Sequence, residues 1–468
     1  MSHSQIDAQL GQRAIVLGSS LAGLLAARVL SERFAEVWLI ERDQLPADAT
    51  PRKGTPHAVH PHGLLSRGRE VLEELFPGLT ASLVAQGALT GDMHANTQLI
   101  AGGRRFARGV SEFSGLAVSR LGLEAEVRRR VLSQPQVRAI CEVDIIEPTL
   151  DEKGHRATGV RIARRTPGNA QETLAADLVM DCTGRGSRMP QWLANWGYLA
   201  PTEDRVTIGL TYTSAYFRRP STLPLGAVSA IVCSATPELP RPAVMIAQEP
   251  CGDDIPRWVV GLGGYSGDNP ACSLAAMQER AREIGCPEII RVTHEGELLG
   301  EVIRYGMPHS QRRRYERLQR FPENLLVMGD ALTSFNPVYG QGMTVAACEA
   351  MALRAALLGG LGGVHQRFFT AAAKVIDIPW QLAVGTDLSL PMVSGPRSRS
   401  TRFINAYIAR LQRVAEHDSR VALAFIKVVH LLAPPPSLFA PAVLWRVLRG
   451  PRGQSRLVGE GTPRCSPT

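Results

Sequence analysis

The chain has 468 residues, 44% hydrophobic and 20% charged, which is typical of a globular protein of two or three domains with a sizeable core. Its formal net charge is +9, but the basic residues are scattered and no basic-aromatic module is present, so we expect no nucleic-acid partner. The polar stretch 1–13, the eight cysteines without a Cys-x-x-Cys pair and the absence of a run of about 18 apolar residues predict a reduced, cytoplasmic protein without a spanning helix.

The first half of the chain reads as an alternation of strands and helices. An apolar strand at 13–17, an Ala/Leu-rich helix at 21–34 and a strand at 37–40 form a βαβ unit. A loop with two prolines and three histidines follows at 52–65. Helices are then expected at 66–76 and 119–133, and strands at 137–142, 158–162 and 178–180. This order predicts an α/β fold with a parallel sheet.

The second half changes pattern twice. Strands separated by Pro and Gly clusters are expected at 206–217, 227–233, 243–248 and 258–262, which indicates an antiparallel sheet. After a helix at 273–284, a buried strand at 325–328 and an Ala-rich helix at 344–358 return to the α/β pattern. The remainder, from 365 to about 448, is expected to be mainly helical.

A glycine-rich turn lies between the first strand and the first helix. Its sequence is Gly18-Ser-Ser-Leu-Ala-Gly23, and Glu41 ends the second strand. Such a turn lets a pyrophosphate approach the helix N-terminus, and a carboxylate at the next strand end can accept hydrogen bonds from ribose hydroxyls. The sequence therefore predicts dinucleotide binding by Gly18, Ser20, Leu21, Ala22, Gly23 and Glu41.

A second glycine motif resembles a known family. Gly329-Asp-Ala follows the strand at 325–328, and Asn336-Pro-Val-Tyr-Gly-Gln-Gly-Met343 opens the next helix. This arrangement resembles the FAD-dependent monooxygenases of the aromatic-hydroxylase type. The resemblance implies FAD, with Asp330 on the ribityl chain, Gly329, Gly340, Gly342 and Met343 at the cofactor, and the flavin-proximal residues Asn336, Pro337, Val338 and Tyr339. No catalytic side chain is singled out, because the cofactor supplies the chemistry.

Further motifs extend this resemblance. Arg120 matches the position from which the family's Arg or Gln reaches FAD, and Arg42 and Arg52 lie in stretches shared with flavin epoxidases of polyether pathways, which are distantly similar to squalene epoxidase. Thr183-Gly184 replaces the family's Asp-Gly pair. The electrons therefore come either from NAD(P)H directly or through a separate flavin reductase. His57, His60 and His62 lack metal-ligand spacing and are interpreted as flavin-adjacent loop residues, so no metal is expected.

The resemblance implies a domain plan. A Rossmann-like FAD-binding domain would take residues 1–190 and 310–365, an antiparallel-sheet substrate domain 191–309, and a helical region 366–450, followed by a flexible tail at 451–468. Residues 80–118 are assignable to either of the first two domains. Basic amphipathic C-terminal helices are compatible with weak membrane-surface contact or with packing on the protein body.

The sequence leaves four functions open, the last of which is a nonenzymatic flavin-binding protein that a non-reducible bound flavin would indicate. The first is an FAD-dependent monooxygenase that uses molecular oxygen to epoxidise or hydroxylate a lipophilic polyketide- or terpene-like substrate in secondary metabolism, such as antibiotic biosynthesis. The alternative is a redox-neutral cyclase that holds FAD as a structural group and folds a polyene. A flavin halogenase is disfavoured because the Trp-x-Trp-x-Ile-Pro signature is missing.

Overall fold

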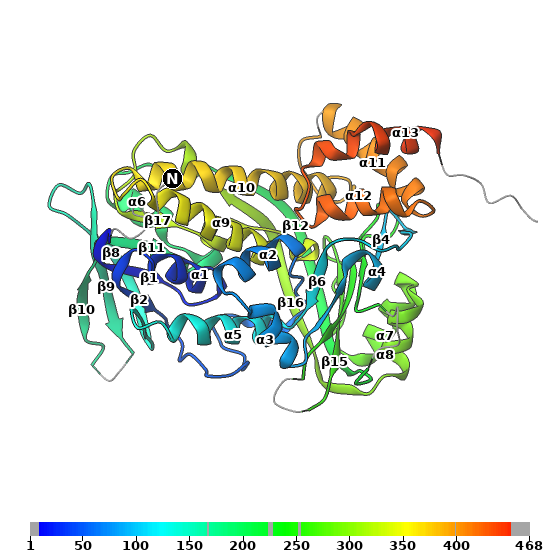
Figure 1. Cartoon of the computed structure of the whole chain (residues 1–468), viewed down its shortest axis with the longest axis horizontal. Coiled ribbons are helices and arrows are strands. Elements are labelled where there is room, and N and C mark those ends of the chain that lie inside the picture. Colours follow the sequence, from blue (N-terminus) through cyan, green and yellow to red (C-terminus); the bar gives the residue numbers. More distant parts are fainter. Residues whose placement is uncertain (1–8, 166–167, 223–227, 251–253, 398, 451–468) are drawn as a thin grey trace, which may run out of the picture.

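The structure, a computed structural model, describes residues 9–165, 168–222, 228–250, 254–397 and 399–450. It combines a five-stranded parallel sheet, a large mixed sheet and a C-terminal group of helices (Figure 1). The α/β fold expected from the sequence is confirmed. The predicted tail at 451–468 lies outside the described residues.

The parallel sheet has the strand order β17-β11-β1-β2-β7. Its members are β1 (Gly11–Leu17), β2 (Phe34–Ile40), β7 (Val137–Ile140), β11 (Leu178–Asp181) and β17 (Leu325–Val327). β11, β17 and the last four residues of β1, Ala14–Leu17, are buried and almost entirely apolar, as strands covered on both faces must be. In register, Leu17 pairs with Ile40 and Asp181, and Asp181 pairs with Val327. The carboxyl ends of these four strands are therefore level, and whatever follows them meets at one edge.

Helices pack against this sheet from the rest of the chain. α9 (Gly342–Leu357) lies on α1 (Leu21–Leu30), and α10 (Val364–Asp387) lies on α9 (Figure 1). α5 (Arg120–Leu132) also contacts α1. The other described helices before α9 are α2 (Ser66–Leu75), α3 (Leu79–Ala85), α4 (Met93–Asn96), α6 (Met189–Asn195), α7 (Leu274–Ile284) and α8 (Pro287–Glu295).

The second sheet has eight strands in the order β18-β16-β12-β15-β14-β13-β4-β5. Their bounds are β4 (Thr97–Ala101), β5 (Arg104–Arg105), β12 (Glu203–Arg218), β13 (Ala230–Cys233), β14 (Ala243–Gln248), β15 (Arg257–Gly264), β16 (Leu298–Arg313) and β18 (Thr333–Ser334). It is antiparallel except where β13 pairs with β4 in parallel. Two small sheets complete the fold: β8 (Val143–Leu150), β9 (Ala157–Arg164) and β10 (Gln171–Ala175) form one, and β3 (Leu89–Asp92) pairs with β6 (Ser114–Ala117).

Some expected elements were wrong or missed. The helix expected at 21–34 ends at Leu30, because a turn at 31–33 returns the chain to Phe34, the first residue of β2. β8 and β16 were not predicted. β16 carries arginines and Pro308, and its pairing with β12 shifts register between Thr207 and Leu210, so it lacks a clean apolar alternation.

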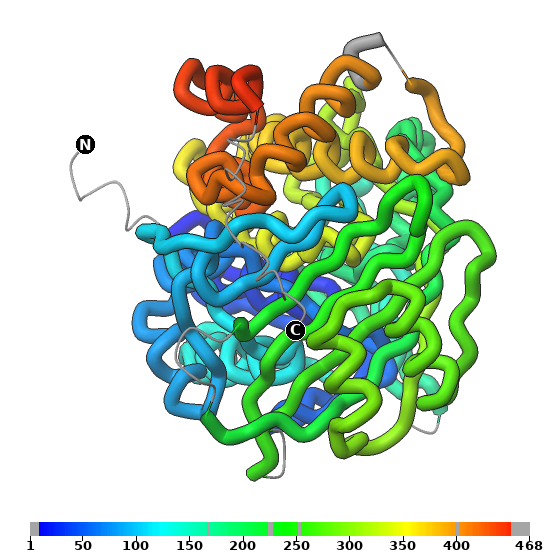
Figure 2. The backbone as a smooth tube through the Cα atoms, turned by 90° about the vertical axis from the view of Figure 1, so that its right-hand side faces the viewer, coloured from blue at the N-terminus to red at the C-terminus, as the bar shows by residue number. Residues whose placement is uncertain are grey.

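The C-terminal helices form a lobe at the top of the molecule (Figures 1 and 2). They are α11 (Arg399–Ala415), α12 (Ser419–Val429) and α13 (Pro441–Arg449). They share a core of their own that includes Leu411, Val421 and Val447. Among the helices that the structure describes, none combines the length and apolar character needed to cross a membrane.

Candidate functional site

The first glycine turn is tightly packed against its neighbours. Gly18 has φ +93°, and a Cβ added there would lie 2.7 Å from the Cys182 carbonyl oxygen. A Cβ at Gly23 would lie 1.9 Å from the Gly18 carbonyl oxygen. Only glycine permits these approaches. The turn directs the N-terminus of α1, with Ser20 as its N-cap residue, toward the open edge of the parallel sheet.

The second glycine turn touches the first. Gly329 has φ +69°, and a Cβ added there would lie 2.6 Å from the Ala22 Cβ. The Gly329 amide donates to the buried carboxylate of Glu349 on α9 at 2.7 Å. Gly184 lies beside the same turn, since its added Cβ would be 4.0 Å from the Asp330 Cβ. Three motifs far apart in the sequence therefore meet at one sheet edge.

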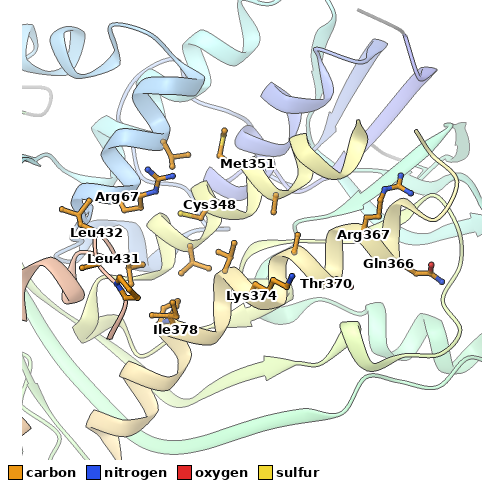
Figure 3. A pocket seen from close by; sticks show the side chains of 18 residues that line it. Arg67, Cys348, Met351, Gln366, Arg367, Thr370, Lys374, Ile378, Leu431 and Leu432 are labelled. Carbon is orange, nitrogen blue, oxygen red and sulfur yellow. The ribbon is translucent and has the colours of Figure 1, made fainter. Parts of the chain in front are cut away.

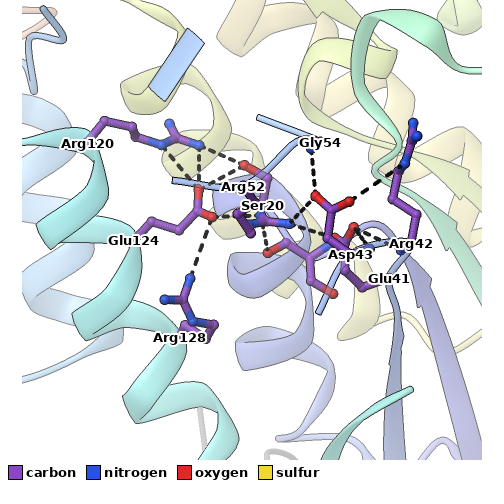
Figure 4. A network of polar contacts seen from close by, with 10 residues as sticks. Ser20, Glu41, Arg42, Asp43, Arg52, Gly54, Arg120, Glu124 and Arg128 are labelled. Carbon is purple, nitrogen blue, oxygen red and sulfur yellow. Dashed lines mark hydrogen bonds and ion pairs between the residues drawn. The ribbon is translucent and has the colours of Figure 1, made fainter. Parts of the chain in front are cut away.

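Buried charges gather around Ser20, at the N-terminus of α1 (Figure 4). The Glu124 carboxylate accepts from Arg52 at 2.8 Å, from Arg120 at 2.9 Å and from the Ser20 hydroxyl at 2.9 Å. Arg120 also donates to the Ser20 hydroxyl at 2.8 Å. Arg52 continues the network to Glu41 at 3.2 Å. This set links the predicted residues Ser20, Glu41, Arg52 and Arg120 through one carboxylate.

Glu124 was not among the predicted site residues. The pKa of its carboxyl falls to about 2, because Arg120 and Arg52 outweigh the opposing effect of burial. It therefore stays ionised and fixes two arginines whose remaining donors face the turn. The signal that could have found it is the i,i+4 spacing of Arg120 and Glu124 on the predicted helix.

Glu41 and Arg42 differ in their surroundings. Glu41 is buried, and its carboxylate accepts from the backbone amides of Ser19, Arg42 and Asp43 at 2.9 to 3.1 Å. The Arg42 side chain is 60% exposed and comes no nearer than 3.9 Å to the carboxylate of Asp43. Glu41 thus belongs to the buried network, whereas Arg42 points outward beside it.

Asp330 lies beside Gly184 in the turn that follows β17. The residue is exposed to solvent, yet enough protein surrounds its carboxyl to raise the pKa of that group, and Arg120 and Arg185 partly oppose the shift. The buried Ser19 hydroxyl and the Gln341 side-chain oxygen have no hydrogen-bond partner in the described chain. Buried polar atoms without a partner are groups that a bound polar cofactor would satisfy.

The histidine loop, residues 52–65, packs against the large sheet. The His60 imidazole lies 2.8 Å from the Ser214 hydroxyl, and its ring meets Tyr212 edge-on. Burial lowers the pKa of His57 and His60 to about 4 and that of His62 to about 3. Within the described ranges, no three His, Cys, Asp or Glu side chains are placed to hold a metal ion.

The loop from Asn336 to Gly342 is anchored from α10. Asp387 accepts from the Asn336 amide at 2.8 Å and from the Tyr339 hydroxyl at 2.7 Å, and Asn336 also donates to the Tyr265 hydroxyl at 2.9 Å. Burial raises the pKa of Asp387 to about 6. At its far end the loop meets the histidine loop, where a Cβ at Gly340 would lie 3.5 Å from the Gly63 Cα. Met343 is buried in the first turn of α9.

A cavity of about 1140 Å³ opens beside this loop. Its lining includes the Pro337–Gln341 loop with His62 and Gly63, residues of β4, β13 and β14, residues of β3 and β6, the second half of α10 and the C-terminal helices. Most lining side chains are apolar, including Val232, Ile246 and Phe425. Such a space suits a large lipophilic molecule.

A second cavity of about 1010 Å³ lies between α9, α10 and α2 (Figure 3). Its lining includes Arg67, Lys374 and Arg367, and it shares Ile378 and Pro434 with the first cavity. It does not include the Asn336–Gly342 loop. Only the first of these two cavities therefore adjoins the predicted cofactor site.

Comparison with known proteins agrees with this geometry. No protein-family model matches the chain. Over 433 residues the chain is 33% identical to Protein Rv3254 of Mycobacterium tuberculosis, covering 90% of this chain and 89% of that one. The chain belongs to the family of this mycobacterial protein.

Solved structures show the same fold at low identity. The flavin-dependent brominase Bmp2 superposes with a TM-score of 0.64 at 13% identity, covering 94% of this chain and 98% of that one. The p-nitrophenol 4-monooxygenase PnpA of Pseudomonas putida DLL-E4 gives 0.61 at 16%, covering 91% and 99%. The flavoprotein/dehydrogenase of Cytophaga hutchinsonii gives 0.63 at 14%, covering 90% and 92%. The chain thus has the fold of flavin-dependent monooxygenases and halogenases. The narrower likeness to polyether or squalene epoxidases stays a prediction.

Proposed function

We propose that the protein is an FAD-dependent monooxygenase that epoxidises or hydroxylates a lipophilic, polyketide- or terpene-like substrate. One observation carries the proposal: three strand-end motifs meet at one sheet edge, and the chain after the third of them, residues 337–341, lines a large and mostly apolar cavity. A bound dinucleotide and an apolar substrate would then both contact this loop. Secondary metabolism, including antibiotic biosynthesis, is the setting that such a substrate suggests, and a cytoplasmic location suits the nicotinamide electron donor.

The residues present fit FAD. Glu41 would hold the adenosine ribose, the α1 N-terminus with Ser20 and Arg120 would hold the pyrophosphate, and Asp330 would hold the ribityl chain. Arg52 would position this set through Glu41 and Glu124. The flavin ring would lie beside Asn336, Pro337, Val338 and Tyr339. Reduced FAD supplies the activation of dioxygen and the transfer of one oxygen atom.

The chain itself would contribute placement and exclusion of water. The apolar faces of β13 and β14 would hold the substrate against the Pro337–Tyr339 turn. The Asp387 carboxylate fixes that turn by two hydrogen bonds. A water-poor cavity protects a reactive oxidant from hydrolysis and side reactions. Placement and protection are what a cofactor-driven oxidation requires of its protein.

One observation favours a second candidate, the redox-neutral cyclase. Thr183-Gly184 stands where the resembling hydroxylases have Asp-Gly, and Asp181 instead binds the Thr183 amide at 2.9 Å and hydroxyl at 2.6 Å. If this change abolishes reduction by nicotinamide, either a separate reductase supplies the electrons or FAD stays oxidised. The polyene-folding cavity would serve either reaction.

The test has two stages. FAD titration followed by flavin fluorescence should show binding that Asp330→Asn weakens by about tenfold or more and that Glu152→Gln, on an exposed turn, leaves unchanged. The loaded protein is then supplied with NADH, NADPH or a flavin reductase, ¹⁸O₂ and a polyene panel. A product heavier by one labelled oxygen supports the monooxygenase. A product of unchanged mass supports the cyclase, and a protein that binds no FAD overturns both.

A further inference from the structure

We propose that the lobe formed by α11, α12 and α13 docks on an anionic lipid membrane. The docking itself is independent of the proposed function. It extends that function by naming the source of a lipophilic substrate, because the docked surface contains the entrance to the main cavity.

Large apolar side chains are exposed mainly on this lobe. Nine such side chains are exposed in the described ranges, and five of them lie between residues 403 and 448. The exposed fractions are 68% for Phe403, 46% for Ile404, 38% for Phe439, 54% for Trp445 and 57% for Leu448. Single exposed apolar residues are ordinary, but a cluster marks a surface that contacts something apolar.

The five side chains come from helices that are joined side by side. Tyr407, one turn after Phe403 on α11, stacks on Phe439 with ring centroids 4.4 Å apart. Arg410 of α11 donates to the carbonyl oxygens of Val447 at 2.9 Å and Leu448 at 2.6 Å on α13. These contacts hold α11, α13 and the segment at Phe439 against one another within the lobe, whose helices are seen in Figures 1 and 2.

The charge of the lobe complements anionic headgroups. Residues 402–449 contain seven basic and two acidic residues. Both acidic residues already have arginine partners, Glu416 with Arg104 at 2.7 Å and Asp418 with Arg446 at 2.6 Å. No described carboxylate pairs with the exposed residues Arg402, Arg413, Arg420 and Arg449. Arg449 instead lies 5.0 Å from the Trp445 ring centroid. Exposed aromatic and aliphatic groups flanked by unpaired cations favour an anionic bilayer surface.

The exposed surface of the lobe is continuous with the lining of the main cavity. Ile404 and Phe439 are exposed on the lobe and also line the main cavity, next to Ile408 and Leu438. A lobe seated in the headgroup region would place this opening against the acyl chains. A lipophilic substrate could then enter from the membrane without passing through water.

The test uses the full-length protein and vesicles of phosphatidylcholine alone or with one third phosphatidylglycerol. Flotation should show at least about tenfold stronger binding to the anionic vesicles, and added salt should weaken it. The double variant F403S/W445S and the charge variant R402E/R449E should each lose about tenfold. Leu199→Ser, at an exposed leucine far from the lobe, should bind as the wild type does. Melting temperatures show that each variant is folded.

Any of three outcomes overturns the proposal. The first is that the protein binds both vesicle types equally or binds neither, and the second is that the two variants still bind. The third is a concentration-dependent dimer in sedimentation velocity that F403S/W445S abolishes, since the surface would then be covered by a second copy. None of these outcomes bears on FAD, whose binding is measured separately, so failure of docking and failure of the proposed function are distinguishable.

Discussion

Tyr339 donates its hydroxyl hydrogen to Asp387 at 2.7 Å, which joins the predicted flavin-proximal loop to the last turn of α10. Asn336 reaches the same carboxylate oxygen at 2.8 Å, while the second oxygen, Oδ2, is buried without a partner in the described chain. Burial raises the pKa of Asp387 to about 6. The charged form is therefore the costly one in the folded protein.

Asp387→Asn should stabilise the protein at neutral pH. Because the folded-state pKa is raised above that of the unfolded chain, the folded state binds more protons between about pH 4 and 6, and the free energy of unfolding falls as pH rises through this window. Asparagine keeps an acceptor oxygen and carries no charge. The difference in unfolding free energy between the variant and the wild type should be roughly 1–3 kcal/mol larger at pH 7 than at pH 4. Urea unfolding across this range measures the gain.

Tyr339→Phe is the matched control for Asp387→Asn. It removes one hydrogen bond and leaves the carboxylate, so it should lower the free energy of unfolding. The pH dependence should persist and become steeper, because this hydrogen bond lowers the pKa of Asp387. A pH-independent difference between Asp387→Asn and wild type would contradict the assignment of this dependence to Asp387.

His62→Gln should flatten the acid side of the stability profile. The pKa of His62 is lowered to about 3, mainly by burial. Below about pH 6.5 the imidazole is therefore protonated in the unfolded chain but stays neutral in the folded chain, and this difference destabilises the fold. The resulting loss of stability toward pH 5 should be smaller by roughly 2 kcal/mol in the variant. Glutamine can still donate to the His60 carbonyl oxygen, as His62 does at 2.9 Å. His155→Gln, at an exposed histidine, should leave the slope unchanged.

Local patterns were enough to predict the frame of the site. Gly18, Glu41 and Gly329 each follow a short apolar strand directly, and the level ends of parallel strands then bring them together. The chain order of strands and helices carried this information without any knowledge of contacts.

The rest of the site depends on contacts that no local pattern reveals. Asp387 lies 51 residues beyond Asn336. The apolar pattern of the helix that contains it indicates only that one helix face packs against the rest of the protein. Glu124 bonds Ser20 from 104 residues away. The main cavity arises where β4, β13 and the C-terminal helices converge, and β4 reaches that sheet from the first part of the chain. Tertiary structure alone creates these relationships.

Glu124→Gln should destabilise the protein strongly. The substitution removes the negative charge that compensates two buried arginines, Arg52 and Arg120, and breaking a buried pair of this kind costs roughly 3–5 kcal/mol. The surface variant Glu70→Gln removes an exposed pair with Arg67 at 3.0 Å and should cost less than about 1 kcal/mol. Urea unfolding of both proteins without added FAD checks the prediction, and equal effects would show that Glu124 is not the centre of the network.

Gly329→Ala should disrupt the contact between the two glycine turns. The added Cβ would lie 2.6 Å from the Ala22 Cβ at a φ of +69°, so α1 must shift away from the second turn. We expect a loss of roughly 2–3 kcal/mol in unfolding free energy and a weaker affinity for FAD. Ala22→Gly removes the opposing methyl group. The double variant should therefore recover part of both losses. It keeps the backbone strain at position 329 and the cost of a glycine inside α1, each about 1 kcal/mol. A double-mutant cycle on unfolding and on FAD titration measures the coupling; strictly additive effects would mean that the turns do not touch.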